Sequence, residues 1–317
     1  MNRTLPKPVL IGIICLFSVA VQTAVFAFNY DYGQVVHRKN SLYTSIFVYQ
    51  SGPVMTLQFG RRQAVAVESQ VDVDNPHVHM LEYSRMTFCG LLYNSEPNSM
   101  LVLGLGGGVI PREMRHYYPS MKIDIVEIDR DILPIASKYF GFQPDDKMKV
   151  HVSDGRVFVK RQLRLDPVPK YDIIILDAFN GDYIPFHLMT KEFLEELKGV
   201  LSDNGVIVAN VFYTNRLFDA EFKTFLDVFG RCQVFYGESS GNAMIVSPAQ
   251  NCPLLTAPEA VQKAAELQDT LKLTFDFVRV AKMLAPDEKP DPQAQTLTDD
   301  RAPVNQLRNQ QTQTSSR

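Results

Sequence analysis

Apolar runs alternate with segments of helical spacing along most of the chain after residue 98. Seven runs predict strands: "MLVLGL" (100–105), "KIDIVEI" (122–128), "KVHVSD" (149–154), "YDIIILDAF" (171–179), "GVIVANVF" (205–212), "CQVFYG" (232–237) and "AMIVSP" (243–248). Helix-like segments separate the first five. One spans Thr190 to Leu201, with Thr190 as its N-cap and Asn204-Gly205 as its stop. Apolar strands separated by helices predict an α/β fold with a doubly wound, mostly parallel sheet.

The last two predicted strands differ from the others. They are joined by "GESSGN" (237–242), a short link rich in turn residues, which predicts an antiparallel hairpin. A seven-stranded, mostly parallel sheet ending in such a hairpin is the plan of S-adenosylmethionine-dependent transferases rather than of nicotinamide dehydrogenases.

A smaller unit precedes this sheet. The runs "SIFVYQ", "VMTLQF" and "RQAVAVES" are separated by turn residues and predict a small antiparallel β unit over about residues 41–70. Helical spacing is predicted for Met80 to Leu92 and for Ala257 to Leu284. We therefore expect four parts, with boundaries listed in chain order: 1–29, an N-terminal segment; 30–75, a β domain; 76–285, a Rossmann-like domain; 286–317, a linker and tail.

The N-terminal segment has the length and polarity of a membrane span. Residues 8–28, "PVLIGIICLFSVAVQTAVFAF", carry no charge, and Arg3 and Lys7 precede them. As a helix rising about 1.5 Å per residue, this stretch matches a hydrocarbon core of roughly 30 Å. It predicts a single-pass membrane anchor, with the side of the membrane left open. A cleaved signal peptide, which implies a secreted or periplasmic protein, and a buried helix are the alternatives.

Charge and cysteine content narrow the set of partners. The 317 residues carry a net charge of -3, which does not provide the basic surface that nucleic acid requires. The four cysteines, Cys15, Cys89, Cys232 and Cys252, lack metal-ligand spacing, so no metal is expected. Isolated thiols are favoured over a pairing of Cys232 with Cys252.

A glycine-rich turn follows the first strand of the predicted sheet. The dinucleotide fingerprint requires glycine at the first, third and sixth positions; Gly104 and Gly106 satisfy two, but the sixth is Val109. This departure argues against a nicotinamide oxidoreductase. Gly106 to Gly108 still leave bare backbone at the carboxyl end of a strand, where open α/β sheets bind their ligands.

Acidic residues end the next two strands. Glu127 lies 23 residues after Gly104, close to the spacing that brings a carboxylate to ribose hydroxyls. The alternative is an acid that is merely solvated in a loop. Asp154 could accept a hydrogen bond from an adenine amino group, or could be the N-cap of the following helix.

The fourth strand delivers Asp177 to the same edge of the sheet, and a loop containing Asn180, Asp182 and Pro185 follows. This is an active-site position in such folds. Asp177 is interpreted either as a catalytic base or as a residue that caps the loop through backbone amides near Asn180. Asp172, at the opposite end of the strand, is interpreted as structural.

Five motifs occur in the order found in one family. They are "LVLGLGGGVIPRE", "IVEID", "SDGR", "YDIIILDAFNGDYIPFHLMTKEF" and "LTDDRAPVNQL", and the likeness covers about residues 42–307. The chain resembles the spermidine synthase family of aminopropyltransferases and, more closely, its spermidine synthase-like relatives attached to membrane segments. The resemblance implies S-adenosylmethionine or its decarboxylated form as donor, and an amine or polyamine as acceptor. A homodimer is left open.

The resemblance also implies roles for individual residues. Asp177 would take a proton from the attacking amine. Tyr83, Asn180 and Asp182 would face the acceptor. The nucleotide site would use Gly104, Gly106, Gly107, Glu127, Asp154 and Gly155.

The chain departs from the family's polyamine site at three places. Gly107 and Asn180 stand where aminopropyltransferases have aspartates, and their Tyr-His-Glu motif reads Tyr83, Ser84 and Arg85. The pocket is therefore expected to have lost two carboxylates and gained a cation, which matters because a polyamine requires carboxylates around it.

Two hypotheses remain after the nicotinamide reading is set aside. The first is a transferase that moves an aminopropyl or methyl group from a sulfonium nucleotide to an amine, with Asp182 as a replacement for one missing carboxylate. The second is a nucleotide-binding or scaffold homologue that keeps the fold without polyamine synthesis.

Overall fold

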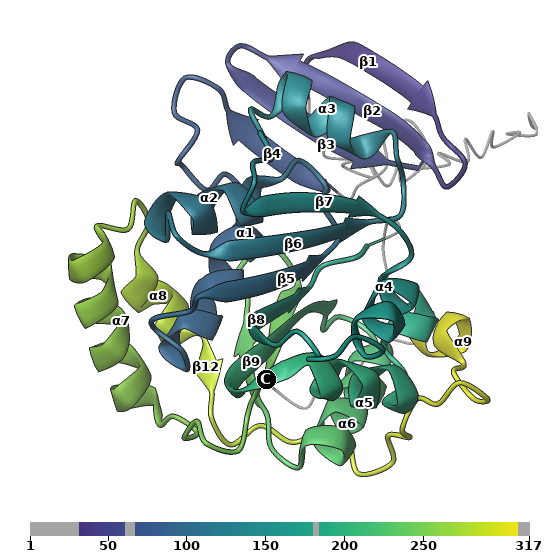
Figure 1. Cartoon of the computed structure of the whole chain (residues 1–317), viewed down its shortest axis with the longest axis vertical. Helices are drawn as coiled ribbons and strands as arrows, with labels where there is room; N and C mark the ends of the chain where they lie inside the picture. Colours follow the sequence, from purple (N-terminus) through teal and green to yellow (C-terminus); the bar gives the residue numbers. More distant parts are fainter. Residues whose placement is uncertain (1–31, 61–66, 180–183, 310–317) are drawn as a thin grey trace, which may run out of the picture. The chain divides into compact units, whose positions relative to one another are not determined.

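The protein is seen in a computed structural model that describes residues 32–60, 67–179 and 184–309 (Figure 1). Its first sheet is antiparallel, with strand order β1-β2-β3-β4. The strands are β1 (Gln34–Asn40), β2 (Ser45–Ser51), β3 (Val54–Phe59) and β4 (Ser69–Asp72). The predicted β unit is therefore present, but β1 precedes it and β4 begins where the third predicted strand was expected to end. Because β1 is largely exposed, it lacks the apolar alternation that would have marked it as a strand.

The second sheet has eight strands in the order β12-β10-β11-β9-β8-β5-β6-β7. The five strands β9, β8, β5, β6 and β7, which follow one another upward in Figure 1, are parallel. The remaining neighbours, β9 with β11, β11 with β10 and β10 with β12, pair in antiparallel fashion. The strands are β5 (Ser99–Leu103), β6 (Lys122–Glu127), β7 (Met148–Val152), β8 (Tyr171–Leu176), β9 (Leu201–Phe212), β10 (Gln233–Tyr236), β11 (Asn242–Pro248) and β12 (Leu284–Ala285). The predicted α/β fold, its seven strands and the antiparallel hairpin are confirmed. The sequence did not predict the short strand β12, which pairs with β10.

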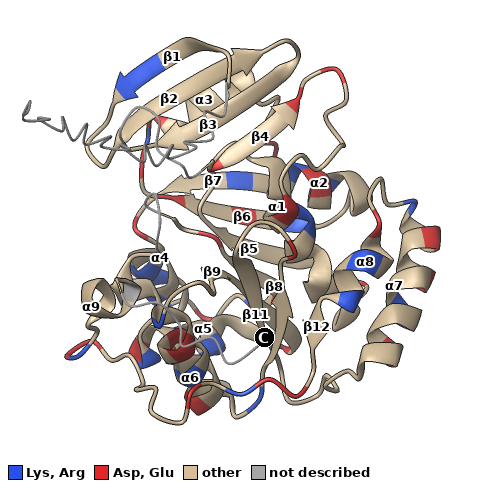
Figure 2. Cartoon of the chain, turned by 180° about the vertical axis from the view of Figure 1, so that it is seen from behind, with Lys and Arg blue, Asp and Glu red and all other residues tan. Residues whose placement is uncertain are grey.

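Helices cover both faces of this sheet because successive strand residues point to opposite sides. Met100 and Val102 of β5 belong to one buried cluster, and Leu101 and Leu103 to the other. The first face is covered by α1 (Glu82–Met86), the 3₁₀ helix Thr87–Leu92, α2 (Val109–Tyr117), α3 (Ile132–Tyr139), α7 (Ala257–Leu271) and α8 (Phe277–Lys282). The second is covered by α4 (Gly155–Gln162), the 3₁₀ helix Phe186–Leu188, α5 (Lys191–Val200), α6 (Leu217–Phe229) and α9 (Val304–Arg308). Residues of both charge signs occur on α5, α6 and α7 (Figure 2).

The predicted start of helix α5 is confirmed, but its predicted end needs correction. Thr190 is the N-cap, as predicted, and its hydroxyl accepts from the backbone N–H of Phe193. The helix stops at Val200, however, because Leu201 is already extended and pairs with Tyr171 of β8. Strand β9 therefore begins before the Asn204-Gly205 turn signal.

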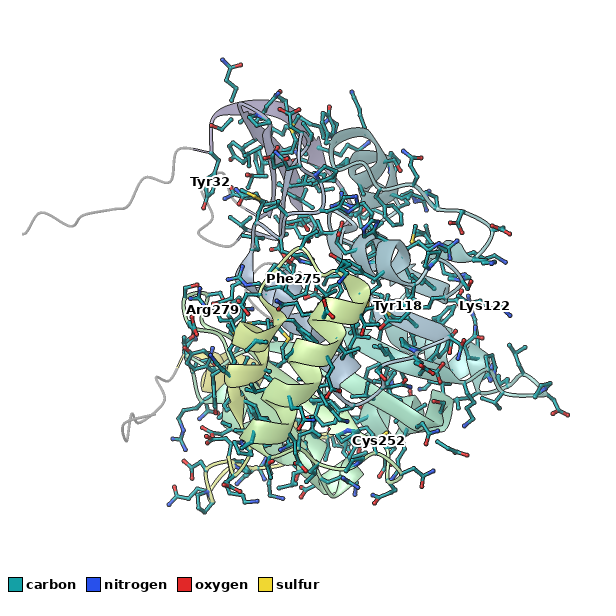
Figure 3. The ribbon with its side chains drawn as sticks, turned by 90° about the vertical axis from the view of Figure 1, so that its left-hand side faces the viewer. Tyr32, Tyr118, Lys122, Cys252, Phe275 and Arg279 are labelled. Carbon is teal, nitrogen blue, oxygen red and sulfur yellow. The ribbon has the colours of Figure 1, made fainter. Side chains whose placement is uncertain are left out.

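The helix predicted over 257–284 is interrupted and forms two helices, α7 and α8. The first, α7, ends at Leu271, because its C-cap Lys272 has a left-handed φ of 55° that cannot continue a helix. The chain then brings Phe275, labelled in Figure 3, against the rings of His79 and Phe88 at centroid distances of 4.7 and 5.2 Å. Packing of this partly buried aromatic side chain explains why the amphipathic pattern continues through the break between α7 and α8.

The expected membrane localisation is also corrected. Over the described ranges, every helix is too short or too polar to span a bilayer. Residues 8–28, on which the anchor was predicted, lie outside those ranges. Cys89, Cys232 and Cys252 are buried free thiols, so the preference for isolated thiols over a Cys232–Cys252 pair is confirmed.

The second sheet has a topological switch point between β5 and β8. From β5 the chain adds β6 and β7 on one side, and then returns to add β8 and β9 on the other. The loops after β5 and β8 therefore diverge at the carboxyl edge of the sheet. Open α/β sheets bind ligands at such a point.

A buried acid on α6 should make stability depend on pH. Glu221 is 4% exposed, and burial raises its pKa from 4.5 to about 8. The folded protein therefore binds this proton more tightly than the unfolded chain, and its contribution to stability is lost as pH rises from about 4.5 to about 8. We expect Glu221→Gln to melt at nearly the parent temperature at pH 5, but roughly 2 °C or more above it at pH 9.

Glu195→Gln on α5 is a matched control for Glu221→Gln, because the Glu195 side chain is 55% exposed. Its melting temperature, measured by circular dichroism, should follow the parent at both pH values. An equal gain for Glu221→Gln at pH 5 and pH 9 would contradict the role of the buried charge.

Candidate active site

A cleft opens at the switch point, at the carboxyl ends of β5, β6, β7 and β8. It contains most of the side chains and glycines singled out from the sequence. Those that line it are Tyr83, Gly104, Gly106, Glu127, Asp154, Gly155 and Asp177. Asn180 and Asp182 lie outside the described residues, so their predicted place near the acceptor stays a prediction. Gly107 lies next to the cleft but is not part of its wall.

Gly104 is required by the close approach of two strand ends. Its φ is +103°, and a Cβ at this position would lie 2.3 Å from the carbonyl oxygen of Asp177. The Asp177 N–H donates to the Leu103 carbonyl at 2.9 Å, which joins the ends of β5 and β8. Glycine at 104 is therefore needed to bring the Asp177 carboxylate to the turn after β5.

The position of Gly107 is closed by residues from outside the second sheet. Its N–H donates to Oγ of Ser69, at the start of β4, at 2.8 Å. A Cβ on Gly107 would lie 2.8 Å from both Cβ of Ser69 and Cδ1 of Phe140. The space that a larger side chain such as aspartate would need here is filled, so the surrounding packing fits glycine at this position.

Glu127 ties the loop after β5 to the loop after β6. Its Oε2 accepts from the N–H of Leu105 at 3.0 Å, and its Oε1 accepts from the N–H of Asp129 at 2.8 Å. The residue is 8% exposed, and burial raises the pKa of its carboxyl against the opposing effect of these two bonds. The carboxylate is therefore ordered by the backbone and is not merely solvated in a loop.

Asp154 serves as the N-cap of α4, the alternative that the sequence left open. Its Oδ1 accepts from the N–H of Val157 at 2.9 Å, and its Oδ2 lies 2.9 Å from Nε2 of His187. The bond to His187 is the main reason that the pKa of Asp154 falls below its usual value. Both oxygens thus have a partner within the protein.

Asp177 stands at the end of a chain of polar side chains. Its Oδ1 accepts from Nδ2 of Asn210 at 2.8 Å, and Oδ1 of Asn210 accepts from Nδ2 of Asn242 at 2.9 Å. Burial raises the pKa of Asp177 to about 7, while the bond from Asn210 acts in the opposite direction. The carboxyl group can therefore exchange a proton near neutral pH.

Tyr83 lines the cleft and is oriented by the segment before β4. Its hydroxyl donates to the carbonyl of Glu68, which also accepts from Oγ of Ser69 at 2.7 Å. Burial, and after it the charge of Asp177, raises the pKa of Tyr83 well above its usual value. The phenol therefore stays protonated, and its hydroxyl hydrogen is engaged in the bond to the Glu68 carbonyl.

Arg85 does not bring the expected cation into the cleft. It is absent from the residues that line the cleft over the described ranges, and its guanidinium lies 3.8 Å from Oε1 of Glu82. Because α1 is a helix with about 3.6 residues per turn, the side chain two positions after Tyr83 points roughly to the opposite side of the helix. The expectation of a pocket with an added arginine was wrong.

Several residues that line the cleft were not predicted from the sequence. Asn210 and Asn242 did leave a signal, because each is a polar residue within or next to an apolar run; the structure shows that both are buried. Glu68 and Ser69 belong to the first sheet and its approach, and His187 follows the loop after β8. No local pattern connects these segments to the second sheet.

The cleft carries an excess of acidic groups. Among the described residues that line it there is no lysine and no arginine. The carboxylates are those of Glu68, Glu127, Asp129, Asp154 and Asp177. Histidine, cysteine and acidic side chains of the described part of the chain form no group of three suited to a metal ion.

Comparisons with known proteins identify the family. The model of the spermine/spermidine synthase domain matches residues 80–237. A polyamine aminopropyltransferase from Vibrio vulnificus is 38% identical over 301 residues, which cover 93% of this chain and 98% of that protein.

Two solved structures are similar to the fold. A probable spermidine synthase from Corynebacterium glutamicum has a TM-score of 0.65 at 18% identity, covering 86% of this chain and 99% of that one. Human methyltransferase-like protein 13, solved in complex with SAH, has a TM-score of 0.56 at 28% identity, covering 61% of this chain and 93% of that one. The membrane-attached branch inferred from the motifs is not supported by these matches. The chain belongs to the spermine/spermidine synthase family and is a transferase.

Proposed function

We propose that the protein transfers an aminopropyl group from decarboxylated S-adenosylmethionine to an amine. The observation that carries this proposal is the cleft lined by five carboxylates and, over its described residues, by no lysine or arginine. Such a wall attracts cations and disfavours anions. Decarboxylated S-adenosylmethionine carries a sulfonium and an ammonium group, whereas S-adenosylmethionine adds a carboxylate that this wall would repel.

The nucleotide would bind along the turn after β5. Gly104 and Gly106 leave its backbone accessible, and Gly107, one residue on, shapes the turn through its bond to Ser69. Glu127 has free lone pairs on both oxygens beyond the two backbone bonds, and these would accept from the ribose hydroxyls. Asp154 and Gly155 would border the adenine.

The acceptor would lie between Asp177 and Tyr83. The Tyr83 hydroxyl donates its hydrogen bond to the backbone carbonyl of Glu68, so its oxygen is available to accept a hydrogen bond from an ammonium group. Glu68 also lines the cleft and directly precedes Ser69, whose side chain closes the Gly107 position. We propose that Glu68, with Asp182 as predicted, compensates for the aspartates that the family has at positions 107 and 180.

Asp177 would act as the base. A free alkylamine is mostly protonated near pH 7, and only its neutral form can attack. The ammonium loses one proton to the Asp177 carboxylate, and the nitrogen then bonds to the carbon next to the sulfonium. The bond from that carbon to sulfur breaks, its electron pair stays on sulfur, and a neutral thioether leaves. A pKa of about 7 suits this exchange at neutral pH.

Methyl transfer is the second candidate. It is favoured by the likeness to human methyltransferase-like protein 13, whose structure contains SAH, and by glycine at position 107. A homologue that binds the nucleotide without catalysis is the remaining alternative. Donor preference separates these hypotheses.

The first test measures donor binding by calorimetry. Because the wall is acidic, we expect decarboxylated S-adenosylmethionine to bind at least about tenfold more tightly than S-adenosylmethionine. Glu68→Gln should reduce this preference severalfold by removing one negative charge. Tighter binding of S-adenosylmethionine together with a methylated product would favour methyl transfer, and binding of neither donor would refute transfer.

The second test concerns the base. Asp177→Asn keeps the acceptor oxygen for Asn210 but cannot take a proton, so turnover should fall by roughly 10² to 10⁴. Turnover of the parent should fall as pH drops through about 7, because Asp177 must be ionised. At pH 8 the variant should unfold at a higher temperature than the parent, since a raised carboxyl pKa costs stability above it. Retained turnover with a lower melting temperature would identify Asp177 as structural.

The third test concerns the ribose. Glu127→Ala should weaken donor binding about tenfold or more, because charge-assisted bonds of roughly 1.5 to 3 kcal/mol are lost. Asp172→Ala is the matched control: this carboxylate also accepts from two backbone amides, those of Asn98 and Ser99, but at the opposite edge of the sheet. Calorimetry should find the parent affinity in Asp172→Ala. Equal losses in the two variants would indicate general destabilisation instead.

A further inference from the structure

Two buried asparagines stand behind Asp177 on neighbouring strands. Asn210 on β9 is 2% exposed and Asn242 on β11 is 6% exposed, and both reach the wall of the cleft. Ala209 pairs with Leu176 of β8, so the next residues along, Asn210 and Asp177, are neighbours. Asn210 pairs with Met244 of β11, and Asn242, two residues away, points to the same face. The strand register therefore aligns the three polar side chains.

The hydrogen bonds in this row have a defined direction. Asn242 donates to the amide oxygen of Asn210, and the Asn210 amide nitrogen donates to Oδ1 of Asp177. If the Asn210 amide were flipped, its oxygen would face the carboxylate and its nitrogen would face the donor of Asn242. With Asn242 as observed, the first contact would then join two acceptors and the second two donors. The carboxylate and Asn242 therefore both favour the orientation in which Asn210 donates to Asp177.

We propose that Asn210 and Asn242 are positioning residues that hold Asp177 by Oδ1 and leave Oδ2 to receive the proton of the acceptor. This inference rests on the proposed function and extends it to residues behind the base. In the step itself the ammonium nitrogen gives one proton to Oδ2. Asn210 keeps its own protons and stabilises the carboxylate before the transfer.

The remaining titratable groups of the cleft come from several elements. Glu68 precedes β4 and Tyr83 is on α1, while Glu127 and Asp129 follow β6, Asp154 follows β7 and His187 follows β8. Nε2 of His187 lies 2.9 Å from Oδ2 of Asp154. All of these groups are common to the parent and to variants at 210 and 242, so a difference between their pH profiles reports on Asp177.

The experiment compares Asn210→Ala and Asn242→Ala with Ser247→Ala as the matched control. Ser247 is also on β11 and fully buried, and its hydroxyl has no hydrogen-bond partner among the described residues. Two quantities are measured for each protein. One is the pH profile of kcat/KM with decarboxylated S-adenosylmethionine and a diamine. The other is the titration of the Asp177 carboxyl by ¹³C NMR without substrate, assigned with Asp177→Asn.

Loss of a donor to the ionised carboxylate raises its pKa. We expect Asn210→Ala to move both the NMR titration and the acid limb of kcat/KM upward by about one pH unit or more. Asn242→Ala should move both in the same direction by less, with the donor KM unchanged. Ser247→Ala should match the parent in both measurements.

The outcomes separate this inference from the proposed function. A parent without transfer activity would refute the function, while the NMR titration would still test the asparagines. Unchanged titrations in both asparagine variants would overturn the inference even if the parent is active. Should Asn210→Ala fail to fold, Asn242→Ala, which leaves the bond to Asp177 in place, carries the same test.

Discussion

The site depends on the contact between the ends of β5 and β8. The Asp177 N–H bonds to the Leu103 carbonyl, and the Asp177 carbonyl lies where a side chain on Gly104 would begin. Any other residue at 104 would have to push the two strand ends apart, because the contact is with backbone atoms. Through this one approach the glycine turn and the acidic residue share a cleft. The diverging loops on either side then leave room for a ligand.

Burial gives the acids of the cleft different properties. Asp177 has one described side-chain donor, Asn210, and its pKa rises to about 7. Asp154 has His187 and the N-terminus of α4 as partners, and its pKa is lowered. The same type of side chain is therefore suited to proton exchange in one place and to a fixed negative charge in another. This division follows from the partners available at the end of each strand.

The first sheet completes the cleft instead of standing apart from it. Ser69 binds the backbone of Gly107 and fills the adjacent space, and Glu68 adds a carboxylate and orients Tyr83. The packing around Gly107 is thus set partly by a segment that is distant in the sequence. An acidic residue of that segment, Glu68, lines the same cleft as the glycine turn.

The sequence by itself determined the parallel sheet, its closing hairpin, the glycine turn and the acids at Glu127, Asp154 and Asp177, because strand ends and apolar period are local properties. Only the tertiary structure decided that Asn210, Asn242 and Glu68 join Asp177 in one cleft and that Arg85 turns away. It also decided that α7 ends before Lys272, so that Phe275 packs against the ring of His79. These depend on strand register and on packing between distant segments. Neither leaves a periodic signal within a short stretch of chain.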